Sequence, residues 1–347
     1  MARDSGRATL AGIAAEAGVS VSAVSKVLNG RTDVAAGTRS RIAALLRSNG
    51  YQVASRLGFG VVDLLIASLH SPWAEELLHG TVQAAVEADA SVVVTTVDSP
   101  AEFAGWLDRA ATRGTDGALC VLHLPDSSEL QRLAAARIPV VVIDPPEEPG
   151  PGIRSVGTTN WQGGLAATRH LIELGHRRIA IIGGPERLWS RRARLDGYRA
   201  ALQAAGLAAD PELIRRDDFC APGGRRQGRQ LLSLPQPPTA IVAGNDSQAF
   251  GVLQALGERG LRAPGDLSVI GFDDVPVASW ATPALTTVRQ PLAAMAATAF
   301  RMLRAGTAGD AAEPHHVELA TTLVIRESTA PPPGQRSAGV PGGRPPG

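Results

Sequence analysis

Between residues 61 and 325, short apolar runs alternate with longer stretches in which apolar residues recur every three or four positions. The first run, Val61–Leu69, is almost continuously apolar, which is typical of a parallel strand buried on both faces. The longer stretches have the spacing of one helix face. Because strands separated by such helices pair as right-handed βαβ units, we expect an α/β fold with two doubly wound parallel sheets.

The alternation predicts a helix or a strand for most of this region. Helices are expected over 73–88, 103–112, 128–136, 162–174, 194–205, 225–232, 248–259 and 292–304. Further strands are expected over 92–97, 118–122, 140–143, 178–182, 213–215, 240–243, 267–270 and 317–325. Ligands of such folds bind beyond the carboxyl ends of the strands, and two sheets placed face to face enclose a cleft that can close on a small molecule.

The residues before this region predict a small all-α unit. The apolar positions with helical spacing are Leu10, Ile13, Ala14 and Ala17 in a first helix, and Val21, Val24, Val27 and Leu28 in a second. Thr9 precedes the first helix, where a hydroxyl can cap a backbone N–H, and Gly18 permits the tight turn that follows it. A helix, a glycine turn and a second helix with short polar residues on one side are typical of a helix-turn-helix.

A third helix is required, because two short helices are unstable by themselves, and residues 38–48 supply its pattern. Residues 1–51 carry seven basic and three acidic side chains, whereas the whole chain has a formal net charge of +1. A basic three-helix unit on a nearly neutral protein favours contact with nucleic-acid phosphates. The alternative is an ordinary helical hairpin whose serines are merely solvated.

The run from Thr9 to Asn29 resembles the DNA-binding headpiece of the lactose-repressor (LacI) family. The positions that match the family pattern are Thr9, Ile13, Ala14, Ala17–Ser20, Val24–Asn29 and Thr38. The resemblance implies a sequence-specific transcriptional regulator, a repressor, that binds double-stranded operator DNA as a homodimer or higher oligomer. It implies DNA contacts for Thr9, Ser20, Val21, Ser22, Ser25, Lys26, Asn29, Arg31 and Thr38. Of these, Val21, Ser22 and Lys26 would lie in the major groove.

The resemblance extends through the alternating region to about residue 328. The similar motifs are Val156–Asn160, Gly175–Ile179, Ile182–Gly184, Ala193–Tyr198, Ala243–Asp246, Val269–Asp274 and Leu285–Gln290. This core resembles type I periplasmic sugar-binding proteins, which implies a small carbohydrate effector in the cleft. The family's effector contacts fall on Trp73, Arg194, Phe219, Asn245, Asp273 and Gln290, and Asp144 follows a predicted strand at the same edge.

Aromatic, carboxylate, amide and guanidinium groups together suit a polyhydroxylated ring. Aromatic faces stack on its C–H surface, and bidentate polar groups bind pairs of neighbouring hydroxyls. The alternative for each acidic or amide residue is that it follows a strand because it caps the next helix. Asn245, which directly precedes Asp246 and Ser247, is the plainest example.

The chain is divided by these patterns into a DNA-binding domain at 1–52, a linker at 53–60, an effector-binding and dimerisation core at 61–329 and a disordered tail at 330–347. Family members have a Pro-Asn pair and an Ala-Arg-x-Leu run in the linker, which fold on DNA as a hinge helix with a leucine in the minor groove. Here the linker lacks that pair and contains Gly58 and Gly60, which disfavour a helix. We expect a short flexible tether that does not sharply kink the operator; the alternative is that Leu57 acts as a wedge.

Other classes of function are disfavoured by what the sequence lacks. No run is long enough to cross a bilayer, and Met1–Arg7 is not followed by an apolar signal core, so we expect a cytoplasmic protein. The two cysteines, Cys120 and Cys220, provide neither a metal cluster nor a disulfide framework, and no cofactor is expected. A doubly wound enzyme would use a phosphate-binding glycine loop or a nucleophile elbow, and neither motif occurs, so we do not expect an enzyme. An exported sugar-binding protein would have no use for residues 9–29.

Overall fold

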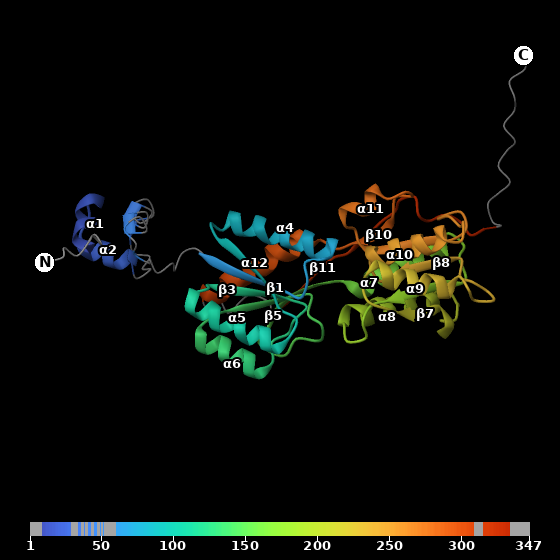
Figure 1. The fold of residues 1–347 in the computed structure, drawn as a ribbon, viewed down its shortest axis with the longest axis horizontal. Helices are drawn as coiled ribbons and strands as arrows, with labels where there is room; N and C mark the ends of the chain where they lie inside the picture. Colours follow the sequence, from blue (N-terminus) through green and yellow to red (C-terminus); the bar gives the residue numbers. More distant parts are fainter. Residues whose placement is uncertain are drawn as a thin grey trace, which may run out of the picture.

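The computed structural model describes residues 9–28, 60–308 and 315–333, together with positions 34, 35, 38, 41, 42, 45, 46, 49 and 51. A helical headpiece precedes two α/β subdomains, each built on its own six-stranded sheet (Figure 1). The fold class expected from the sequence is confirmed. Residues 52–59, which hold most of the linker and Leu57, lie outside the described residues, so the tether remains a prediction.

The headpiece begins with α1 (Leu10–Ala17) and α2 (Val21–Leu28), which are bent by 109° relative to each other. The Thr9 hydroxyl accepts a hydrogen bond from the Gly12 N–H at 3.2 Å, and Gly18 takes the left-handed conformation with φ of 64°. The described positions of the expected third helix, 38, 41, 42, 45 and 46, are helical. The small core buries Ile13, Ala14, Ala17, Val24, Val27, Ile42 and Leu46.

No single helix among the described residues is long and apolar enough to cross a bilayer, although α1 and α2 taken together as a bent pair meet the criteria of length and composition. Both helices contribute fully buried residues to the headpiece core.

The first α/β subdomain has an all-parallel sheet in the order β11-β5-β4-β3-β1-β2. Its strands are β1 (Val61–Ile66), β2 (Ser91–Thr96), β3 (Gly117–Val121), β4 (Val140–Ile143), β5 (Arg154–Thr158) and β11 (His316–Leu319). Its helices are α4 (Pro72–Glu87), α5 (Pro100–Arg113), α6 (Ser127–Ala136) and α12 (Leu292–Ala308). Helices α4 and α12 cover one face of the sheet, and α5 and α6 cover the other (Figure 1).

The second subdomain repeats this plan with the order β12-β10-β9-β8-β6-β7. Its strands are β6 (Ile179–Gly183), β7 (Ile214–Arg216), β8 (Ala240–Ala243), β9 (Ser268–Asp273), β10 (Thr286–Arg289) and β12 (Thr322–Val324). Its helices are α7 (Asn160–Glu173), α8 (Trp189–Ala204), α9 (Ala221–Leu231), α10 (Asp246–Gly257), the short α11 (Pro276–Trp280) and the 3₁₀ turn η1 (Pro211–Leu213). The strands of this sheet pair in parallel except at one edge, where β12 pairs with β10 in the antiparallel sense.

The chain crosses between the two subdomains three times, from β5 to α7, from β10 to α12 and from β11 to β12. Hydrogen bonds tie these crossings together. The Thr158 hydroxyl donates to Gln290 Oε1 at 2.8 Å, and the Thr321 N–H donates to the Thr159 hydroxyl at 2.9 Å. Three short bonded segments of this kind form a hinge at which the two subdomains can turn relative to each other.

The sequence patterns did not predict strands β5 and β10 or helix α11, and they predicted as one strand a segment that forms two. β5 (Arg-Ser-Val-Gly-Thr) and β10 (Thr-Thr-Val-Arg) are largely polar, so they lack the apolar run that marked the four-residue strands β4 and β8. Helix α11 has only five residues, too few for a helical period. The expected strand at 317–325 is divided into β11 and β12, which belong to different sheets. Helix α8 begins at Trp189, five residues before the start predicted at Arg194. The earlier start was missed because the first turn of α8 is largely polar and carries no apolar face.

Candidate functional site

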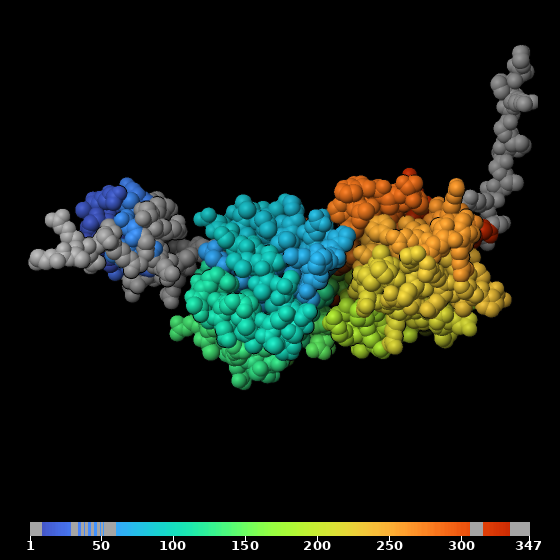
Figure 2. Space-filling model, viewed as in Figure 1, coloured from blue at the N-terminus to red at the C-terminus, as the bar shows by residue number. Residues whose placement is uncertain are grey.

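The molecular surface is indented between the two subdomains (Figure 2). A buried arginine of the second subdomain contacts Asn160, the first residue of α7 after the crossing from β5. Arg194 in α8 is 6% exposed. Its guanidinium carbon lies 3.6 Å from the ring centroid of Phe272 and 5.7 Å from that of Phe219. Arg194 Nε donates to Asn160 Oδ1 at 2.8 Å, and Nη1 donates to the Gly244 carbonyl at 2.5 Å. The arginine is therefore fixed by stacking and by directed hydrogen bonds.

Carboxylates from both subdomains lie within electrostatic range of this guanidinium. Burial lowers the pKa of Arg194, and the negative charges of Asp273, Asp144 and Asp246 oppose that shift. Asp144 directly follows β4 in the first subdomain, whereas Asp273 ends β9 in the second. Arginine stays protonated in proteins, so the site holds one fixed cation among several acidic groups.

Asp273 is the carboxylate whose position is most closely specified. Its backbone has φ of 119°, a region that non-glycine residues rarely adopt and that is common at functional sites. Gln290 Nε2 donates to Asp273 Oδ1 at 2.7 Å, and Gln290 is itself held by Thr158 at the hinge. Burial raises the pKa of Asp273 to about 7, with Arg194 and Gln290 acting in the opposite direction. This carboxyl group therefore changes its protonation near neutral pH.

Asp144 is held from the other side of the site. Its φ is 50°, and its N–H donates to the Val156 carbonyl at 2.8 Å. Burial raises the pKa of Asp144, and the charge of Arg194 lowers it. Asp144 is 6% exposed, and the charge of Arg194 reaches it across the boundary between the two subdomains.

Phe219 lies in the loop before α9, against a glycine pair of the second subdomain. A Cβ at Gly184 would approach the Phe219 ring to 2.2 Å, so the ring can occupy this place only because residue 184 is glycine. Asn245 holds the same loop, since its Nδ2 donates to the Phe219 carbonyl at 3.3 Å. Asn245 Oδ1 accepts from the Gln248 N–H at 2.8 Å and caps α10. The side-chain oxygen of Asn245 therefore caps the next helix, as the alternative interpretation of this residue predicted.

Six of the seven expected effector residues are linked by hydrogen bonds, ring contacts or electrostatic interactions: Asp144, Arg194, Phe219, Asn245, Asp273 and Gln290. Trp73 lies in the first turn of α4, half-buried against the core of the first subdomain. Its stacking on a ligand stays a prediction.

Three residues that support the set were not among the expected contacts. Asn160 accepts from Arg194, and Phe272 stacks on it. Asp246 is buried, accepts from the Thr287 hydroxyl at 2.5 Å and from the Val275 N–H at 3.0 Å, and has a pKa raised well above its ordinary value by burial. All three lie in motifs that resemble the family core, Val156–Asn160, Val269–Asp274 and Ala243–Asp246, but the resemblance assigned no effector contact to them.

Asp274 does not form an acid pair with Asp273. Its two oxygens bind Arg289 at 2.6 Å and Arg326 at 2.6 Å, so it belongs to a separate ion-pair cluster. Within the described ranges, no group of three or more His, Cys, Asp and Glu side chains could hold a metal ion.

The expected DNA-binding surface lies on the headpiece. Val24 and Val27 of the second helix are buried, but Val21, which shares their apolar spacing, is 49% exposed and so available for the expected contact in the major groove. Ser22 is also exposed, and Ser25, Lys26 and Thr38 are half-buried. The Ser20 hydroxyl accepts from the Ala23 N–H at 3.2 Å, so Ser20 and Thr9 both cap helices. Asn29 and Arg31 lie outside the described residues.

Two family models match the chain. Residues 9–53 match the model "Bacterial regulatory proteins, lacI family", and residues 168–329 match "Periplasmic binding protein-like domain".

Known proteins are similar over nearly the whole length. The HTH-type transcriptional repressor PurR of Escherichia coli is 33% identical over 334 residues, which cover 94% of this chain and 98% of PurR. The structure of the transcriptional regulator CelR in complex with cellobiose is 33% identical with a TM-score of 0.71, and the match covers 92% of this chain and 99% of CelR. The lac repressor dimer bound to operator and the anti-inducer ONPF is 27% identical with a TM-score of 0.72, over 93% of this chain and 99% of that one.

Proposed function

The chain belongs to the lacI family of bacterial regulatory proteins and is a transcriptional regulator, and we propose that a small carbohydrate bound between its subdomains controls its affinity for operator DNA. The observation that carries the proposal is the buried Arg194 with Asp144 and Asp273 around it, because these groups come from both subdomains. A ligand that contacts both favours one relative orientation of the subdomains, and differential contact of this kind is what an allosteric effector needs.

The chemistry of the set suits a sugar. Carboxylates accept hydrogen bonds from neighbouring hydroxyls, and a guanidinium donates to hydroxyl or ring oxygens through its planar fork. Phe219 and Trp73 supply aromatic rings, and such rings can stack against the C–H face of a pyranose or furanose. The similar CelR structure contains cellobiose, which supports a carbohydrate in the same kind of core.

A panel of sugars tests the proposal directly. We expect at least one mono- or disaccharide to raise the melting temperature of the full chain in a thermal-shift assay, because a ligand that binds the native state stabilises it by mass action. The same sugar should change operator affinity in fluorescence anisotropy. The panel includes planar nitrogen bases, and binding of such a base with no response to any sugar would overturn the carbohydrate assignment.

The affinity for the effector should depend on pH through Asp273. With its pKa raised to about 7, this carboxyl is mostly protonated at about pH 6 and mostly ionised at about pH 8. Sugar hydroxyls donate better to the ionised form, so binding should tighten about tenfold as pH rises over this range, in proportion to the ionised fraction. Titration calorimetry in two buffers of different ionisation enthalpy should also detect protons released on binding near pH 7. Equal affinity at both pH values without proton release would contradict this role.

The DNA side of the proposal rests on α2. We propose that Val21, Ser22 and Lys26 face the major groove, where an ammonium can donate to guanine O6 and N7, and that Thr9, Ser20, Ser25 and Thr38 lie near the phosphates. Asn29 and Arg31 retain their expected DNA contacts as part of this proposal. Two headpieces of a homodimer would read two half-sites.

Lys26→Ala should reduce discrimination between operator and random DNA by about 1–3 kcal/mol. The loss of a base contact affects the operator alone, whereas the loss of a phosphate contact weakens both kinds of DNA alike. Titration of both duplexes at one salt concentration measures the ratio. If both affinities fell by the same factor, Lys26 would be a phosphate contact instead.

A further inference from the structure

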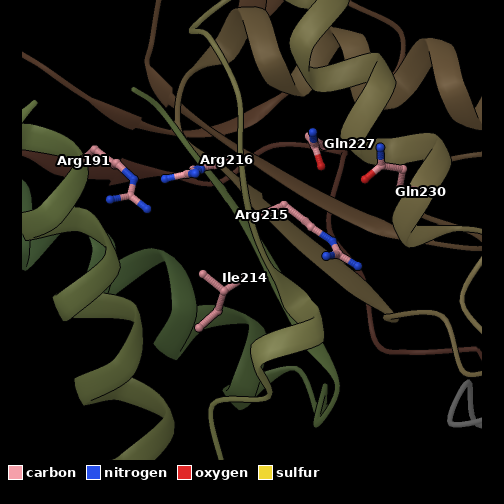
Figure 3. A pocket seen from close by; sticks show the side chains of 6 residues that line it. All are labelled: Arg191, Ile214, Arg215, Arg216, Gln227 and Gln230. Carbon is pink, nitrogen blue, oxygen red and sulfur yellow. The ribbon is translucent and has the colours of Figure 1, made fainter. Parts of the chain in front are cut away.

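A pocket of about 300 Å³ beside the edge strand β7 is lined by Arg191, Ile214, Arg215, Arg216, Gln227 and Gln230 (Figure 3). Its polar side chains do not converge on one point. Ile214 packs into the core on the α8 side of the sheet, where Arg191 lies over Gly183, so Arg215, the next residue of the strand, points to the opposite face. The start of β1 in the first subdomain is different, because several side chains there are directed at one short piece of backbone.

Gly60 and Val61, the first described residues after the linker, are bonded on both sides. The Gly60 carbonyl accepts from the Ser91 N–H at 3.0 Å, and the Val61 carbonyl accepts from the Asp116 N–H at 2.9 Å. Asp116 Oδ2 accepts from the Gly60 N–H at 2.7 Å and from the Val61 N–H at 2.9 Å. Two successive N–H groups that bind one carboxylate oxygen make strong, charge-assisted hydrogen bonds. These four residues form what we call the linker anchor.

Asp116 is itself held by the turn that carries it, which joins α5 to β3. In this turn the Thr115 hydroxyl donates to Asp63 Oδ2 at 2.6 Å. Arg113, the last residue of α5, donates to both oxygens of Asp63, at 2.6 and 2.8 Å. Asp63 lies in β1, two residues after Val61, and its side chain is fully buried. A buried carboxylate requires partners of this kind, so the turn is fixed to the same strand that Asp116 binds.

The linker anchor lies at the amino ends of the parallel strands, whereas Asp144 of the candidate effector site follows the carboxyl end of β4. β1 has six residues, so about 20 Å separates the two ends of the sheet. Asp116 therefore cannot contact an effector in the cleft. Instead it binds the backbone at the point where residues 1–59 join the core.

We propose that Asp116 is a positioning residue for operator binding, because it fixes the point from which the linker leaves the core. The inference rests on the proposed function, in which paired headpieces bind two half-sites. Two linked modules bind most tightly when the length of the linker matches the span between their sites. Without the carboxylate, Gly60 and Val61 lose two hydrogen bonds and can leave the sheet, and each adds up to about 3.3 Å to the reach of the linker.

Hydrogen exchange on the full chain, without DNA or sugar, tests the linker anchor independently of the proposed function. Mass spectrometry resolved to single residues follows the N–H groups of Gly60 and Val61. In Asp116→Ala we expect both to exchange at least about tenfold faster, because each loses a charge-assisted hydrogen bond. In Asp116→Asn the side-chain oxygen can still accept from them, so their exchange rates should be closer to those of the wild type than to those of the alanine variant.

The affinity for operator DNA tests the positioning role. The probes are duplexes with two half-sites from a sequence that the wild-type chain selects from a random pool, with the original spacing or with two base pairs inserted. Two base pairs add about 7 Å, which is within the reach that the freed residues of two copies provide. The preference for the original spacing should fall by at least about threefold in Asp116→Ala and be kept in Asp116→Asn. A general loss of stability would weaken binding to both duplexes by the same factor.

The control is Asp108→Ala, which removes an exposed acid of α5 that pairs with Arg132. It should match the wild type in both experiments. Should thermal melting show that Asp116→Ala is unfolded, Asp116→Ser gives the same readings, because its shorter side chain cannot reach both N–H groups.

Three results would overturn the proposal. Unchanged exchange at Gly60 and Val61 in Asp116→Ala would show that the carboxylate does not hold them. Faster exchange with an unchanged spacing preference would leave Asp116 a structural role alone. A wild-type chain with no spacing preference would refute the paired half-sites and the positioning role together, and the exchange rates would still decide whether the linker anchor exists.

Discussion

Asp273→Ala is expected to abolish the response to the effector while leaving operator affinity near that of the wild type. The carboxylate lies at the carboxyl end of β9, in the interaction range of Arg194 and bonded to Gln290, and it is far in the sequence from the headpiece. Its removal deletes charge-assisted hydrogen bonds worth about 1.5–3 kcal/mol each, so sugar affinity should fall by about 100-fold or more. Anisotropy titrations of labelled operator with and without the sugar measure both quantities.

Asp274→Asn is the matched control for this variant. Asp274 is the next residue in the chain, but its carboxylate binds Arg289 and Arg326 and belongs to another cluster. The Asp274→Asn protein should therefore respond to the sugar as the wild type does. A normal response of Asp273→Ala at the wild-type sugar concentration would remove Asp273 from the effector site, whatever the control shows.

The alternation of strands and helices was enough to predict the two-sheet architecture, and the comparisons with PurR and the lac repressor confirm the family that the headpiece motif indicated. What periodicity could not predict was the crossing pattern. β5 and β10 are short strands that end at the hinge, and the last expected strand is shared between two sheets. Such segments are placed by long-range pairing rather than by any local repeat, so no local pattern shows which sheet they join.

Local sequence patterns also could not predict all the side-chain contacts of the candidate site. Arg194 and Asp273 could be named from motifs, but the stacking of Phe272 on Arg194 depends on how α8 packs against β9. Asn245 illustrates the opposite case. A local rule, that asparagine caps a helix, correctly described its oxygen, while its contact with the Phe219 loop arises only in three dimensions.

An exposed apolar stripe on α4 bears on the proposed homodimer. Val82 and Val86 are 44% and 72% exposed and are four positions apart, so they lie on one face of the helix. Val94 on the edge strand β2 is 36% exposed. Grouped apolar exposure of this kind marks an interaction surface, and a two-fold axis through it would bury the same stripe from both copies. We propose that α4 and β2 contribute to the dimer interface of this regulator.

If this proposal holds, Val86→Arg should convert the proposed dimer to monomers and reduce operator affinity by about 100-fold or more. A two-fold contact would bring two added charges close together in an apolar surface, which is costly without a partner. A monomer can hold only one half-site, so it loses the gain in effective concentration that links the second headpiece to the first. Sedimentation velocity measures the mass, and operator titration measures the affinity.

Ile325→Arg serves as the control, because Ile325 is also an exposed apolar residue, at 62%, but it follows β12 in the second subdomain. It should remain dimeric if the interface lies on α4 and β2. A Val86→Arg protein that stays dimeric with normal operator affinity would place the interface on another surface. If Val86→Arg were monomeric yet bound operator normally, each headpiece would act alone, and the reading of paired half-sites would have to be abandoned.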